Sequence, residues 1–185
     1  MYRTDRLIRD IRRFRGDNTP TGIVLPDIPV APPVCDKPDI GTDAPEQNNA
    51  DSDCFTYEMV GSTYAVSGLT DVGRAATSLT VPYSYKGVKI TRLLSGAFAG
   101  ADALRSVTVQ TNINQIQNDV FDGCDDLTAI YILHTDPHGI TVGMAGGLLN
   151  GTPDDCLVYV PSDSLSLFIN DYNWEAYRSR LRGQG

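Results

Sequence analysis

An internal repeat of 23 residues is the feature that most constrains what this chain can fold into. The segment ITRLLSGAFAGADALRSVTV (90–109) aligns with INQIQNDVFDGCDDLTAIYI (113–132) at this constant offset. A repeat of this length is the signature of a solenoid, in which each coil buries its apolar face against the next coil. The matching pairs are Ile90 and Ile113, Leu93 and Ile116, Phe98 and Phe121, Gly100 and Gly123, Asp102 and Asp125, Leu104 and Leu127, Val107 and Ile130, and Val109 and Ile132.

Each repeat contains one short strand, at Val107–Val109 and at Ile130–Ile132. The first and third residues of both strands are apolar, and alternate residues of a strand share a face, so these residues should point into the core. Stacked strands lie about 4.8 Å apart. We expect Phe98 and Phe121 to fill the core from the opposite side of each coil.

Two less regular coils flank these repeats. LTV (79–81) and VYV (158–160) look like the same strand, which gives starts at 79, 107, 130 and 158 and spacings of 28, 23 and 28 residues. Each flanking coil therefore carries five additional residues. We expect these insertions to include Tyr83-Ser84-Tyr85 in one coil and Gly143–Gly147 in the other.

Both ends of the repeat region carry segments suited to covering an exposed coil. FTYEMV and TYAVSGL flank Gly61-Ser62, which predicts a β-hairpin with glycine first in the turn. After the last strand, Ser162 or Asp163 can cap a short helix. That helix should present Leu165, Phe168 and Ile169, and a second helix from Asn173 should present Trp174, Tyr177 and Leu181. The fold class predicted is a β-rich solenoid with an N-terminal β-hairpin cap and a C-terminal helical cap.

These pieces resemble the BspA-type leucine-rich repeats, over about residues 55–181. The motifs that carry the resemblance are TYAVSGL, LTVPYSYKGVKI, GAFAGADALRSVTV, DVFDGCDDLTAIYI and VYVPSDSLSLFINDYNWEAY. That family occurs in bacterial surface proteins, some protist proteins and some phage proteins, so the resemblance implies a short leucine-rich-repeat stack with a binding role. The chain departs from the family pattern at Ala99 and Ala101, which replace residues that are usually larger or polar, and at Leu149, which stands where phenylalanine is expected.

Residues 1–16 predict an amphipathic basic anchor helix. Six arginines stand against Asp5 and Asp10, a net charge of +4. The apolar stripe needs a partner, because an isolated helix this short is marginal in water. Nucleic acid, a membrane surface and an acidic protein remain open, and we favour a groove on a protein partner. The residues expected to contact it are Leu7, Ile8, Ile11, Phe14, Arg6, Arg9 and Arg13.

Residues 17–53 predict an extended, Pro-rich acidic arm. They hold seven of the eleven prolines and a net charge of −7. Proline favours extended paths, and the segment has too few apolar residues to bury a core. The chain thus divides into the anchor helix 1–16, the arm 17–53 and the leucine-rich-repeat domain with caps, 54–185.

Composition excludes several functions. The acidic body would repel phosphates, which argues against general nucleic-acid binding. No apolar stretch is long enough to span a membrane, and we expect no secretory signal, because the first residues lack an apolar core region.

The cysteines at 35, 54, 124 and 156 have no metal-binding spacing, so we expect four reduced thiols, with a Cys35–Cys54 disulfide as the alternative.

No catalytic constellation is present in the sequence. His134 and His138 share one loop with Asp136, where a polar turn is favoured over a metal site. Asp119, Asp122, Asp125 and Asp126 lack the spacing of a calcium loop, and we expect a solvated acidic face. We therefore expect a non-enzymatic protein that needs no cofactor and no metal.

Tyrosines in the hairpin and strand regions favour recognition, because tyrosine is enriched in protein interfaces. We expect a protein or glycan ligand on the repeat face, contacting Thr108, Tyr131, Tyr83 and Tyr85. Three classes of function follow: a structural or attachment protein of a larger particle, plausibly a phage virion; a bacterial surface adhesin or receptor-binding module; or an enzyme with an unrecognised site. We favour the first class, which places the protein in a virion rather than on a bacterial cell surface.

Overall fold

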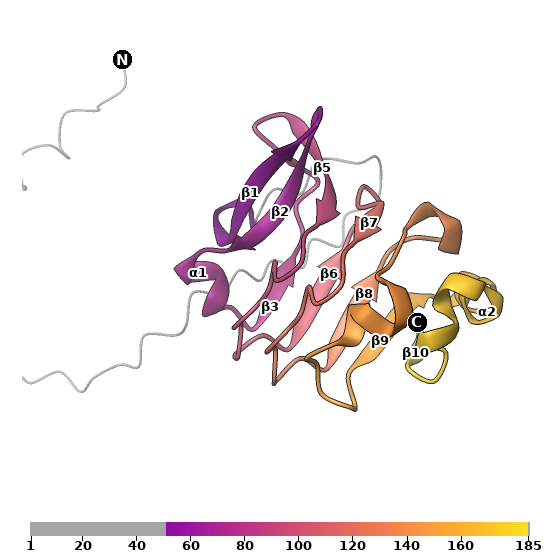
Figure 1. The fold of residues 1–185 in the computed structure, drawn as a ribbon. Helices are drawn as coiled ribbons and strands as arrows, with labels where there is room; N and C mark the ends of the chain where they lie inside the picture. Colours follow the sequence, from indigo (N-terminus) through magenta and orange to yellow (C-terminus); the bar gives the residue numbers. More distant parts are fainter. Residues whose placement is uncertain (1–50, 185) are drawn as a thin grey trace, which may run out of the picture. The chain divides into compact units, whose positions relative to one another are not determined.

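A computed structural model describes residues 51–184 of this chain (Figure 1). The anchor helix predicted at 1–16 and the arm up to residue 50 lie outside the described residues. Asp51 and Ser52, which the sequence places in the arm, contact the folded part. The Asp51 carboxylate accepts a 2.8 Å hydrogen bond from the Thr80 N–H, and the Ser52 carbonyl accepts one from the Tyr57 hydroxyl at 2.9 Å.

A five-stranded parallel sheet runs through the repeats, with the strand order β10-β9-β8-β6-β3 (Figure 1). Neighbouring strands pair Leu79 with Val107, Val107 with Ile130, Ile130 with Val158, and Val158 with Leu181. The predicted offset of 23 residues and the four predicted strands are therefore confirmed, although each strand begins one residue earlier than predicted. The strands are β3 (Ser78–Thr80), β6 (Ser106–Val109), β8 (Ala129–Ile132), β9 (Leu157–Pro161) and β10 (Leu181–Gln184).

A second, mixed sheet contains the predicted hairpin. Its antiparallel strands β1 and β2 are joined at Gly61, whose φ of +66° is of the kind that glycine adopts without strain. β5 pairs in parallel with β2 and with β7, and its first residues pair antiparallel with β4. A single bridge from Gln115 to Thr141 continues the sheet. The strands are β1 (Phe55–Val60), β2 (Thr63–Leu69), β4 (Ser84–Tyr85), β5 (Val88–Leu93) and β7 (Gln115–Ile116).

The helices are short and connect these strands. Thr70 caps the first α-helix, because its hydroxyl accepts a hydrogen bond from the Gly73 N–H. Within residues 51–184 no helix has the length and apolar character needed to cross a membrane. The helices are α1 (Asp71–Arg74), α2 (Leu165–Asn170) and the 3-10 helices η1 (Ser52–Cys54), η2 (Pro137–Gly139), η3 (Met144–Leu149), η4 (Ser162–Ser164) and η5 (Tyr172–Tyr177).

The core lies between the two sheets and the turns that join them. Val107, Val109, Ile130 and Ile132 are fully buried, as the strand alternation predicts. Phe98 and Phe121 are also fully buried, and their ring centroids lie 4.9 Å apart, so the same position of two successive coils packs together. The turns follow the same register, since the Phe98 N–H donates to the Val120 carbonyl.

The glycine-rich insertion in the last coil forms η3. Gly143 and Gly147 both pack against the Asn118 side chain, and a Cβ on either residue would overlap the Asn118 amide. The Tyr177 hydroxyl holds this segment in place, because it donates to the Gly143 carbonyl at 2.8 Å and accepts from the Leu148 N–H at 3.1 Å. The glycines are thus required by close packing between coils.

Two predictions for the C-terminal segment are wrong. Leu181 was predicted to share a helix with Trp174 and Tyr177, but it begins β10 and pairs with Val158. Pairing with β9, and not the helical spacing of these three residues, determines the conformation here, since the Val158 N–H donates to the Arg180 carbonyl. Ile169, predicted to face the core, is 36% exposed, whereas Phe168 is fully buried.

The stacked core predicts the cost of truncating its rings. Phe121→Ala and Phe98→Ala should each lower the free energy of unfolding by about 3–5 kcal/mol, because each leaves a cavity at the contact between coils. Urea unfolding of the full chain measures this cost. Met59→Ala is the control, since Met59 is 55% exposed and its truncation should change the free energy by no more than about 0.5 kcal/mol. A phenylalanine variant as stable as this control would contradict the packing described.

Candidate binding surface

A row of side chains crosses the outer face of the parallel sheet. Thr80 pairs with Thr108, Thr108 with Tyr131, Tyr131 with Tyr159, and Tyr159 with Arg182. These residues alternate along each strand with buried ones, so their side chains lie on the side of the sheet away from the core. The first four are half-buried and Arg182 is exposed. We call this row the outer ladder.

Two tyrosines form the centre of the outer ladder. The rings of Tyr131 and Tyr159 stack with centroids 5.0 Å apart and an interplanar angle of 20°. Stacking restricts both rings, and both residues are half-buried. A second row runs beside the ladder, where the Ser106 hydroxyl donates to the Ser78 hydroxyl at 2.9 Å. The result is a surface with hydroxyl groups, two aromatic rings and one guanidinium in fixed order.

The structure brings together only two of the four residues that the sequence assigned to the repeat face. Thr108 and Tyr131 are register partners on the outer ladder. Tyr85 belongs instead to β4 of the mixed sheet, and Tyr83 precedes it. Tyr159 was not among the predicted residues, although the alternation of VYV places it on the same face. Arg182 was not predicted either, because its segment was expected to be helical.

Tyr85 packs into an aromatic cluster with Tyr57 and Tyr64. Its ring stacks on Tyr57 at 4.1 Å and meets Tyr64 edge-on at 5.2 Å. Burial raises the pKa of Tyr57, and the neighbouring Tyr85 adds to that shift. The three rings are half-buried and pack against the core. Tyr83 lies beneath the Lys89 ammonium, 5.5 Å from its ring centroid. This cluster therefore stabilises the hairpin and the β4–β5 turn.

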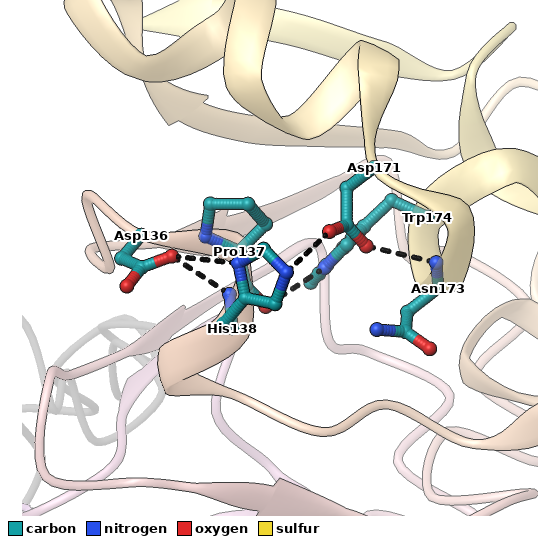
Figure 2. A network of polar contacts seen from close by, with 6 residues as sticks. All are labelled: Asp136, Pro137, His138, Asp171, Asn173 and Trp174. Atoms are coloured by element: carbon teal, nitrogen blue, oxygen red, sulfur yellow. Dashed lines mark hydrogen bonds and ion pairs between the residues drawn. The ribbon is translucent and has the colours of Figure 1, made fainter.

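The two histidines of the 134–138 turn have separate partners. The His134 ring is buried, and its Nε2 lies 2.7 Å from the Ile113 carbonyl oxygen. Figure 2 shows His138 between two carboxylates, with Nδ1 3.2 Å from Asp136 and Nε2 3.2 Å from Asp171. No group of three potential metal ligands occurs within residues 51–184.

His138 joins the turn to the C-terminal helices. Asp171 is buried and caps η5, because its carboxylate also accepts a 2.8 Å hydrogen bond from the Asn173 N–H (Figure 2). The Trp174 indole N–H donates to the Pro137 carbonyl of the same turn at 3.4 Å. The contacts of His138 thus hold the turn against η5.

The acidic loop is solvated in part. Asp122, Asp125 and Asp126 are exposed, whereas Asp119 is half-buried and accepts a 2.8 Å hydrogen bond from the Asn150 amide of the next coil. Asp119 has a φ of +57°, which aspartate tolerates better than most residues. One member of the acidic loop therefore links two coils.

The cysteines are of two kinds. Cys54 is disulfide-bonded, so the prediction of four reduced thiols is wrong for this residue, and Cys35 of the alternative pairing lies outside the described residues. Cys124 and Cys156 are free and fully buried. Burial raises the pKa of the Cys124 thiol to about 12 and that of Cys156 to about 11. Because the thiolate is the nucleophile, both thiols should be inert in the folded protein.

Comparisons with known proteins find a likeness among solved structures. No protein-family model matches the chain, and no curated protein matches it. Among solved structures, the chain is similar to a leucine-rich repeat protein from Bacteroides ovatus, with 17% sequence identity and a TM-score of 0.42. The match covers 62% of this chain and 38% of that protein, so the chain spans well under half the length of this neighbour.

Burial of His134 predicts that acid destabilises the fold. Its pKa is lowered from 6.5, mainly because burial disfavours the charged ring. The unfolded state therefore binds more protons than the folded state below pH 6.5, and stability should fall as the pH drops through this range. Chemical unfolding at pH 7 and pH 5 should show a larger loss in the wild type than in His134→Gln. Equal losses would mean that His134 is not the responsible group.

The raised pKa values of the two free cysteines predict that they resist alkylation. In native protein at pH 8, peptides containing Cys124 or Cys156 should carry no label after iodoacetamide treatment, and in urea both should be labelled. Mass spectrometry of the digested protein measures this. Asp125→Cys provides an exposed thiol as a positive control. Rapid native labelling of Cys124 would contradict its burial.

Proposed function

We propose that this protein is a non-enzymatic binding component whose repeat region is a short BspA-type leucine-rich-repeat solenoid. In this proposal the β1–β2 hairpin and the C-terminal helices act as caps on the first and last coils. The outer ladder of the parallel sheet is the binding surface, and its ligand is a protein. The observation that carries the proposal is the row of Thr80, Thr108, Tyr131, Tyr159 and Arg182 on five paired strands.

The physical case for the outer ladder is preorganisation. The backbone of each ladder residue is held in a sheet, and the two central rings are stacked on each other, so binding would order few additional groups. Less ordering means less entropy lost on association. Tyrosine and arginine are the side chains that most often dominate the energy of protein interfaces. A protein surface with complementary hydrogen-bonding groups fits this row.

In the same proposal, the N-terminal residues attach the protein to a larger assembly. The basic segment 1–16 would dock on a protein of a larger assembly, and residues 17–50 would connect it to the repeats. A virion is the assembly that we favour, and a bacterial surface adhesin or receptor-binding module is the alternative. Both placements stay predictions from the sequence.

The central tyrosines provide the test of the outer ladder. Tyr131→Ala together with Tyr159→Ala should weaken binding of the partner by at least about tenfold, since hot-spot truncations cost about 2 kcal/mol or more. The partner is the protein that co-purifies with the full chain from its source, identified by mass spectrometry, purified and titrated by calorimetry. Loss of the stacking itself should destabilise the fold by about 0.5–1.5 kcal/mol, and loss of the half-buried ring area adds to this, so urea unfolding checks that the variant is folded.

Leu167→Ala is the control for this experiment. Leu167 is 55% exposed and lies outside the outer ladder. Its removal should leave the affinity for this partner unchanged. If the ladder variant binds the partner as tightly as Leu167→Ala does, the partner binds elsewhere and the proposal for the outer ladder fails.

A further inference from the structure

The mixed sheet ends one coil before the parallel sheet. A segment of the mixed sheet precedes each of the first four strands of the parallel sheet: β2 precedes β3, β5 precedes β6, β7 precedes β8, and Thr141 precedes β9. Before the fifth strand, β10, the chain forms α2 and η5 instead. No described strand therefore lies beyond Thr141 in the mixed sheet.

A groove lies where that strand is missing. It consists of two hollows of about 390 and 510 Å³ that share Val142, Gly143 and Met144. Polar side chains, among them Gln115 and Gln117, line the smaller hollow, and residues of η5 line the larger one. Volumes of this size are typical of sites that take a small ligand or a short piece of chain.

One residue at the edge of the mixed sheet has backbone groups without a hydrogen-bond partner among residues 51–184. Thr141 uses both of its backbone groups on the neighbouring coil, because its N–H donates to the Asn114 carbonyl and its carbonyl accepts from the Ile116 N–H. Consecutive residues of an extended segment direct these groups to opposite sides. The next residue, Val142, is 7% exposed and lines both hollows, and within residues 51–184 its N–H and carbonyl have no hydrogen-bond partner.

The side chains of the groove indicate what would bind there. Met144 from η3 and Tyr172 from η5 line the larger hollow, and they are 83% and 85% exposed, which is unusual for large apolar side chains. Glu175 is the one charged residue among those that line the two hollows, and its carboxylate also forms an exposed ion pair with the Arg178 guanidinium at 3.4 Å. An apolar side chain flanked by a basic one complements these groups.

We propose that the groove binds an extended peptide segment of a protein partner, which adds as a further strand to the mixed sheet. Its backbone pairs with Val142, an apolar side chain lies between Met144 and Tyr172, and a lysine or arginine faces Glu175. Strand addition is an established mode of peptide recognition, in which the main chain supplies affinity and side-chain pockets supply specificity. This site is separate from the outer ladder and does not depend on it.

The experiment uses the full chain and an array of short synthetic peptides. Each peptide has a central apolar residue and one lysine, and each has a counterpart in which aspartate replaces the lysine. The tightest lysine peptide should bind with a Kd below about 1 mM and at least about tenfold more tightly than its counterpart, measured by fluorescence polarisation. Failure of every lysine peptide to reach this affinity, or equal binding of the aspartate set, overturns the proposal.

Variants then locate the peptide. Met144→Lys and Tyr172→Lys should each weaken binding at least about tenfold, because each places a like charge beside the basic peptide. Met59→Lys, a comparably exposed methionine on the hairpin, should have no effect. Unchanged binding in both groove variants overturns the assignment of the site. The double tyrosine variant of the outer ladder should bind the peptide normally, which separates this result from that of the proposed function.

Peptide backbone methylation tests strand addition. In a strand, alternate N–H groups point toward the neighbouring chain. Methylation of the amides of one alternate set should abolish binding, whereas methylation of the other set should be tolerated. Equal tolerance of both sets overturns strand addition as the mode of binding.

Discussion

Backbone hydrogen bonds between successive coils hold residues 51–184 together. They run through the parallel sheet, through the β5–β7 pair and through the turns, where the Gly96 N–H donates to the Asp119 carbonyl and the Asp119 N–H donates to the Gly147 carbonyl. Because all of these bonds share one register, Phe98 comes to lie on Phe121. A slip of one residue would turn each strand over and expose its apolar side chains. The core and the outer ladder therefore depend on the same register.

The sequence predicts those parts of the fold that follow from periodicity. The offset of 23 residues was readable because the apolar positions of two repeats match one by one, and Gly61 marked the hairpin. β10 was missed because Trp174, Tyr177 and Leu181 have helical spacing, although Leu181 is placed by its pairing with β9. Asp51 was assigned to the arm because it follows a Pro-rich acidic stretch. Its contact with Thr80 depends on tertiary structure, which local composition does not report.

The candidate surface was predictable to the same extent. Thr108 and Tyr131 follow from strand alternation inside the recognised repeats, and Tyr159 could have been added by the same rule. Arg182 could not, because its position depends on β10. Tyr85 was assigned to recognition by residue type alone, whereas the stack on Tyr57 shows that it packs within the folded part. The groove at Val142 results from a strand that one coil lacks, and no motif in the sequence marks it.

The hydrogen bond from Thr80 to Asp51 also has a consequence for how copies of this molecule can meet. Within residues 51–184, β3 is the outermost strand of the parallel sheet, and an edge of this kind is a template for joining another molecule. The Asp51 carboxylate occupies the Thr80 N–H, which an incoming strand would otherwise use. Head-to-tail growth would require one copy to offer β10 to the β3 of the next. The contact of Asp51 with Thr80 therefore acts against polymerisation through this edge.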